Sequence, residues 1–124
     1  MKFVADTGEL VALAADLGKV KGDSVKPVIA KSAASIQKLW RANAKASSGR
    51  HARQYPSFIS FDIVDRGFGA EIGPTKRGQG NLGAILEYGS VHNPPHHDGK
   101  RAWQAEEPKL LAALGEAIGK EIGA

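Results

Sequence analysis

The chain has 124 residues, 42% of them hydrophobic and 24% charged, which is typical of one ordinary globular domain with its own core. It contains no cysteine, which excludes a disulfide framework and a thiolate metal site. An early charge argues against a signal peptide, and no apolar run is long enough to span a membrane. We therefore expect a single domain over residues 1–124 and no membrane partner.

The net charge of +4 is unevenly distributed along the chain. Residues 1–81 carry a net charge of +6, and residues 82–124 carry a net charge of −2. This polarity suits a subunit whose basic half meets DNA or the acidic half of a neighbour, and head-to-tail packing of that kind can close a ring. The alternative interpretation is an ordinary solvated surface.

Two amphipathic helices are predicted in the first half of the chain. A capping-box pattern starts the first helix, which runs from about Thr7 to Leu17. Ser24 can cap a longer second helix, whose apolar residues fall on one side from Val25 to Trp40. Four basic residues fall on nearly the opposite side, where they could meet phosphates or acidic groups of a partner: Lys31, Lys38, Arg41 and Lys45.

A basic connection and an antiparallel hairpin follow. The connection, residues 50–56, combines arginines with Tyr55, a pattern that can hold single-stranded nucleic acid by charge and stacking. Apolar and polar residues alternate over Ser57–Val64 and again over residues 68–74, with turn residues between them. Two strands alone are marginal, so the hairpin should pack on the helices or gain strands from neighbours.

The second half of the chain is predicted to contain a loop and two further helices. Residues 75–81 include no apolar side chain, and we expect an exposed, mobile loop that orders on assembly. A short helix should end at Gly89, because glycine commonly terminates a helix in the left-handed conformation. After the turn at Pro94 and Pro95, an amphipathic closing helix is predicted to begin near Trp103. The predicted fold class is α+β.

The sequence Leu86-Glu87-Tyr88-Gly89-Ser90, with the proline-rich turn and the closing helix, resembles a signature of a known family. That family comprises the small head–tail connector, or tail-completion (minor tail), proteins of long-tailed phages. Phenylalanine is usual there where this chain has Tyr88, and threonine where it has Ser90. The chain departs more over residues 96–103, where the family usually has an apolar, proline-containing stretch.

The resemblance implies a structural role without enzymatic chemistry or cofactors. The expected protein is a virion subunit, assembled in the host cytoplasm, that forms a sixfold ring in the neck around the DNA channel. DNA would pass without sequence-specific binding, and neighbouring neck and tail proteins would be the other partners. The expected interface combines the four basic residues with the residues around the motif: Glu87, Tyr88, Gly89, Ser90, Pro94, Pro95 and His96. The alternative function is a small basic nucleic-acid-binding protein.

A histidine cluster is the candidate for catalysis or metal binding: His92, His96, His97 and Asp98. The intervening prolines exclude a helix that would bring His92 and His96 onto one face, although a loop site stays geometrically open. The chain has neither a cysteine nucleophile nor a Gly-x-Ser-x-Gly motif, so we expect no enzyme. Glu87 could be a buried acid, but a salt bridge to a basic neighbour is the simpler interpretation.

Overall fold

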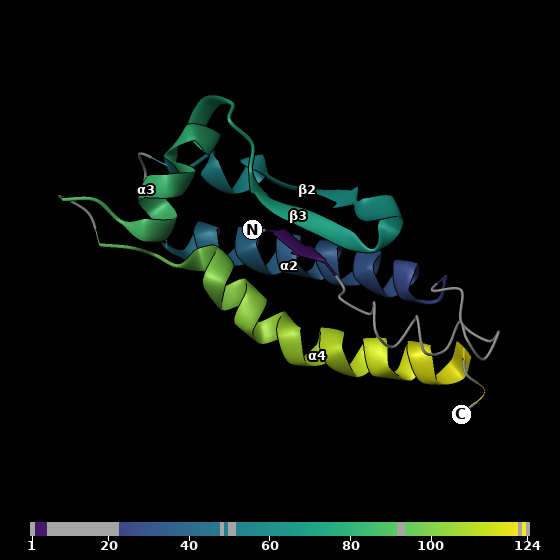
Figure 1. Cartoon of the computed structure of the whole chain (residues 1–124). Helices are drawn as coiled ribbons and strands as arrows, with labels where there is room; N and C mark the ends of the chain where they lie inside the picture. The colour runs from purple at the N-terminus through teal and green to yellow at the C-terminus, as the bar shows by residue number, and fades with distance from the viewer. Residues whose placement is uncertain are drawn as a thin grey trace.

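The structure, a computed structural model, describes residues 2–4, 23–47, 49, 52–91, 94–121 and 123 (Figure 1). The predicted α+β class is confirmed. The first predicted helix, Thr7–Leu17, lies outside the described residues. In chain order the elements are β1 (Lys2–Val4), α2 (Val25–Ser47), β2 (Ile59–Val64), β3 (Gly69–Pro74), α3 (Gly83–Tyr88) and α4 (Asp98–Glu121), with 3-10 turns η2 (Tyr55–Phe58), η3 (Asp65–Gly67) and η4 (Gly78–Leu82).

Helix α2 is the central element of the fold. Figure 1 shows it between the sheet and α4, which runs in the opposite direction to α2. Its predicted apolar stripe is buried at helical spacing, because this face meets the sheet on one side and α4 on the other. The core members contributed by α2 are Val25, Ile29, Ala33, Ile36, Trp40 and Ala44.

The sheet has three antiparallel strands in the order β1–β3–β2. The predicted hairpin is confirmed, and its turn uses a left-handed backbone at Arg66 (φ 58°) and Gly67 (φ 100°). Strand β1 was not predicted, because three residues are too few for alternation to be recognised. It pairs with the far edge of β3, and the Phe3 ring lies 5.4 Å from that of Trp103 in α4.

The prediction of an exposed loop at residues 75–81 is wrong in part. The chain forms η4 there, and Gly80 is buried. A Cβ atom on Gly80 would clash with the carbonyl oxygen of Thr75, so the turn depends on a glycine at this position. The backbone N–H of Gln54 also donates to Oε1 of Gln79 at 2.6 Å, which connects the segment to the chain before η2.

The predicted start of the closing helix near Trp103 is also wrong. Helix α4 begins at Asp98, and Pro108 therefore lies in the helix interior instead of its first turn. The helix begins earlier than predicted because of tertiary contacts: side chains from α2 and α3 form hydrogen bonds with the first turn of α4. Within the described ranges, no helix is long and apolar enough to cross a membrane.

Candidate functional site

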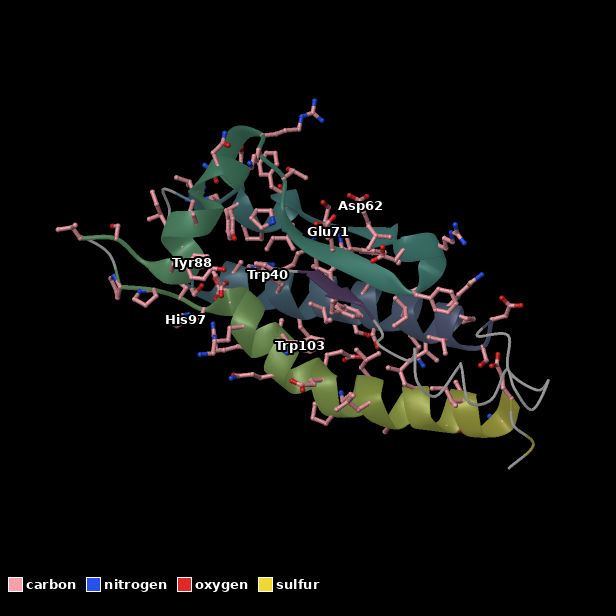
Figure 2. The ribbon with its side chains drawn as sticks, in the orientation of Figure 1. Trp40, Asp62, Glu71, Tyr88, His97 and Trp103 are labelled. Carbon is pink, nitrogen blue, oxygen red and sulfur yellow. The ribbon has the colours of Figure 1, made fainter. Side chains whose placement is uncertain are left out.

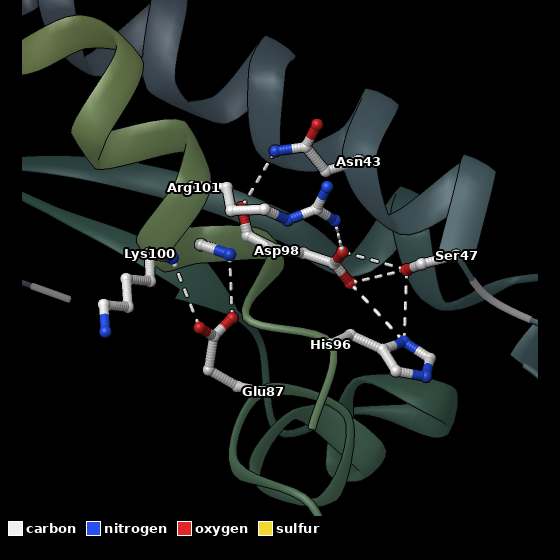
Figure 3. Close-up of polar contacts among 8 residues, drawn as sticks. Asn43, Ser47, Glu87, His96, Asp98, Lys100 and Arg101 are labelled. Atoms are coloured by element: carbon white, nitrogen blue, oxygen red, sulfur yellow. Dashed lines mark hydrogen bonds and ion pairs between the residues drawn. The ribbon is translucent and has the colours of Figure 1, made fainter. Parts of the chain in front are cut away.

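The end of α2, the end of α3 and the start of α4 meet at one place, which we call the three-helix corner (Figure 3). Glu87 of α3 is buried there, and its carboxylate accepts the backbone N–H groups of Gly99 at 2.7 Å and Lys100 at 3.2 Å. The first amides of a helix have no partner within the helix, and a carboxylate also complements the positive end of the helix dipole. Glu87 therefore stabilises the start of α4 from a neighbouring helix.

This arrangement decides between the two interpretations of Glu87. The structure places its carboxylate in the interior of the protein, as the buried-acid alternative requires, and not on the surface where a salt bridge to a partner would form. Two backbone bonds strengthen the same junction, from His96 N to Leu86 O at 2.8 Å and from His97 N to Glu87 O at 3.2 Å. Glu87, the glutamate of the motif, therefore connects α3 to the start of α4 within the protein.

Asp98 joins α4 to α2 in the same corner. Its buried carboxylate accepts the Ser47 hydroxyl, which lies 2.9 Å from each oxygen, and Nη2 of Arg101 at 2.7 Å. The Asn43 amide donates to the Asp98 carbonyl at 3.0 Å. Each bond satisfies a polar group that would otherwise be costly to bury.

His96 completes this network, with its Nδ1 atom 3.1 Å from Ser47 Oγ. The Ser47 hydroxyl has one hydrogen, and if Asp98 accepts it, Nδ1 of His96 is the donor to Oγ. The hydroxyl then faces the carboxylate directly, whereas in a catalytic triad the imidazole lies between the two. The geometry is that of a structural link between α2 and α4.

The turn into α4 is tightly packed. His97 adopts a left-handed backbone (φ 54°), which costs a residue other than glycine about 1–2 kcal/mol. A Cβ atom on Gly99 would lie 2.6 Å from Cη2 and Cζ2 of Trp40. Glycine at this position therefore allows the backbone of α4 to lie against the indole ring.

Three exposed apolar side chains lie on α3 or directly after it: Ile85, Tyr88 and Val91, which we call the apolar patch. Their exposed fractions are 42%, 76% and 95%, and they are three of the five large hydrophobic side chains that are exposed among the described residues. Figure 2 shows Tyr88 on α3, close to His97 at the turn into α4. A pocket of about 370 Å³ adjoins the patch and is lined by Trp40, Glu87, Tyr88, His97, Gly99, Lys100 and Trp103.

The remaining predicted interface residues lie in two places. Around the corner, Gly89 ends α3 with φ 80°, Ser90, Pro94 and Pro95 are exposed, and His96 is half-buried. The four basic residues are all exposed along α2, but Nε of Arg41 donates to the carbonyl oxygen of Ile59 at 2.9 Å. The corner residues are thus brought together, whereas the basic residues form a separate surface.

Tyr55 does not lie where nucleic-acid stacking would require it. It is the first residue of η2, and its ring is buried in the core, so it offers no face to a base. Burial raises the pKa of its hydroxyl to about 12, and the negative charges of Glu87 and Asp98 add to this effect. The stacking role that the alternative, nucleic-acid-binding interpretation would give to Tyr55 is therefore contradicted.

The raised pKa of Tyr55 predicts a loss of stability in alkali. An unfolded tyrosine ionises near pH 10.0, whereas Tyr55 in the fold keeps its proton until about pH 12. Its contribution to stability is thus complete below pH 10 and is lost as the pH rises through 12. Denaturant titrations across this interval should show a smaller decrease for Tyr55→Phe than for the unchanged protein. Equal decreases in the stability of the two proteins would contradict the raised pKa of Tyr55.

The histidine cluster receives no support as a metal site. His92 lies outside the described residues, and His96 and Asp98 are engaged with Ser47. In the part of the chain that the structure describes, no group of three or more acidic, histidine or cysteine residues is placed to hold a metal ion.

Sequence reasoning missed several residues that build the corner. Asn43, Ser47 and Trp40 belong to α2, and their partners in α4 are about half the chain away in sequence, with separations of 55 residues for Asn43 and 51 for Ser47. A local pattern carries no signal of such contacts. The polar Ser47 at the end of a helix was the one available hint.

Comparisons of the chain with protein-family models, with curated proteins and with solved structures find no match.

Proposed function

We propose that this chain is a structural subunit of a phage virion neck, a head–tail connector or tail-completion protein that forms a ring around the DNA channel. The observation that carries the proposal is the apolar patch beside the three-helix corner, because three exposed large apolar side chains within one short segment, residues 85–91, indicate an interaction site. The patch coincides with the motif that resembles this family.

The internal structure of the motif supports this interpretation. Glu87 points inward and holds α4, while the next residue, Tyr88, points outward with 76% of its surface exposed. A tyrosine on a rigid support is well suited to an interface, since it offers a large contact area at a small entropic cost. The motif thus couples a structural residue to a docking residue.

The basic surface of α2 supports the same proposal through charge. Lys31, Lys38 and Lys45 are exposed, and their ammonium groups take part in no ion pair with the described residues. A neighbouring subunit could present its more acidic half to them. The alternative function, non-specific nucleic-acid binding, would use the same three lysines, but it has lost the aromatic contribution expected from Tyr55.

The proposal predicts that Tyr88→Ala weakens assembly. Loss of a central tyrosine from an interface typically costs about 2 kcal/mol, so the subunit dissociation constant should rise roughly 30-fold. Sedimentation over a concentration series measures this change, and circular dichroism should show unaltered helix content. Leu111→Ala is the matched control, because Leu111 is also exposed, at 60%, but lies on α4 outside the patch. Equal effects of the two substitutions would contradict the proposal.

A further inference from the structure

Strand β2 has an open edge. The sheet order places β3 on one side of β2, and no described element pairs with the other side. Among the described residues, β2 makes its main contacts with its hairpin partner, the flanking turns and α2. In Figure 1, β2 lies along the outer side of the sheet, away from β1.

The hydrogen-bond pattern shows which backbone groups face that edge. The N–H of Thr75 donates to the Phe58 carbonyl at 2.8 Å, so the even-numbered positions bond toward β3 and the odd-numbered ones point away. The carbonyl of Ile59 points away accordingly, and it accepts Nε2 of Gln37 at 3.1 Å and Nε of Arg41 at 2.9 Å. The outward N–H and C=O groups of Phe61 and Ile63 have no partner among the described residues.

The side chains near this edge combine one exposed apolar group, Ile63, with two carboxylates, Asp62 and Glu71. Ile63 was predicted to face inward with Ile59 and Phe61. Ile59 is fully buried, yet 44% of the surface of Ile63 is exposed, because β2 is an edge strand and no described strand lies beyond it. On the outer face, Asp62 lies opposite Glu71 in β3, and both are exposed (Figure 2). Like charges opposite each other in a sheet are destabilising, and neither carboxylate forms an ion pair with a described residue.

We infer that the open edge of β2 is a docking site for an extended segment of a partner protein that carries a basic residue between two apolar ones. An antiparallel strand would bond to both Phe61 and Ile63, as in β-augmentation. Its central residue would lie beside Asp62 on the outer face, where a cation would offset the two carboxylates. Its flanking apolar residues would share the face of Ile63 and cover it.

Charge also argues against a second copy of β2 as the occupant. A symmetric antiparallel pair in this register would centre on residue 62 and place two Asp62 carboxylates side by side, with two Glu71 carboxylates close by. On the opposite edge of the sheet, the strand that does pair, β1, places Lys2 in register with Glu71. This inference rests on the sheet edge and does not depend on the neck proposal.

Titration of the full chain with synthetic peptides tests the inference. The probe is a short capped peptide of alternating threonine and valine with one central lysine, and its control has glutamate in place of the lysine. Amide NMR spectra should show shifts at Phe61 and Ile63, and hydrogen exchange at these amides should slow. The glutamate peptide should bind roughly tenfold more weakly.

Two variants complete the design. Asp62→Lys should reverse the preference, so that the glutamate peptide binds more tightly than the lysine peptide. Ile63→Pro removes an outward N–H without removing a ladder bond to β3, and it should weaken binding of both peptides. The inference is overturned if the lysine peptide causes no shifts at Phe61 and Ile63, or if Asp62→Lys leaves the preference unchanged. The Asp62→Lys result stands even if the proline variant fails to fold.

Discussion

Glu87→Ala should lower the free energy of unfolding by about 1.5–3 kcal/mol, the usual contribution of hydrogen bonds that involve a charged group. The substitution removes the acceptor for the backbone N–H groups of Gly99 and Lys100 and leaves them unpaired at the start of α4. Chemical denaturation measures the loss of stability. Hydrogen exchange should become faster at the amides of Gly99 and Lys100 in particular.

Glu116→Ala is the matched control for this prediction. Glu116 also belongs to α4, but it is exposed, and its ion pair is with Lys120, at 3.2 Å, one turn further along the helix. Exposed pairs of this kind contribute about 0.3–0.5 kcal/mol. The prediction is contradicted if Glu87→Ala lowers the free energy of unfolding no more than Glu116→Ala does and the exchange of the two amides is unchanged. Glu87 would then not stabilise the start of α4.

Gly99→Ala should lower the free energy of unfolding by about 1–3 kcal/mol, the typical cost of adding a methylene group to a packed core. Its Cβ atom would lie 2.6 Å from the Trp40 ring, which is buried and has little room to move. Thermal unfolding measures the effect, and the near-ultraviolet dichroism of the tryptophans should change as the indole is displaced.

Gly115→Ala gives the opposite expectation in the same helix. Apart from its chain neighbours and the nearby backbone of α4, no described atom lies within 4 Å of a Cβ placed on Gly115, so alanine should stabilise α4 by up to about 1 kcal/mol through its higher helix propensity. A comparison of the Gly99→Ala and Gly115→Ala proteins separates the effect of steric packing on stability from that of helix propensity. A Gly99→Ala protein as stable as the unchanged one would show that the turn into α4 is looser than the structure indicates.

The elements that could be predicted from the sequence are those with a local pattern. The periodicity of α2, the alternation of β2 and β3, and the glycine that ends α3 each depend on residues a few positions apart. Propensity and periodicity act over that range, so these predictions are confirmed. Strand β1 is too short for such a pattern, and its pairing with β3 spans more than sixty residues.

The candidate site could be predicted only in part, for a related reason. The motif drew attention to Glu87 and Tyr88, but the sequence could not show that one faces the core and the other the surface. The start of α4 at Asp98 depends on Glu87, Ser47 and Asn43, which lie in other helices. Without those contacts, the polar residues 96–101 resemble a loop, and the prediction of a helix beginning near Trp103 follows.

The mass of the full-length protein in solution, at low and high salt and with and without DNA, tests the neck-subunit proposal most directly. The proposal predicts a closed oligomer that persists at high salt, because an apolar interface is not screened, and that is indifferent to added DNA. The Tyr88→Ala protein should shift to smaller species under the same conditions. A monomer that binds DNA at low salt and releases it at high salt would contradict the proposal and would favour nucleic-acid binding through the lysines of α2.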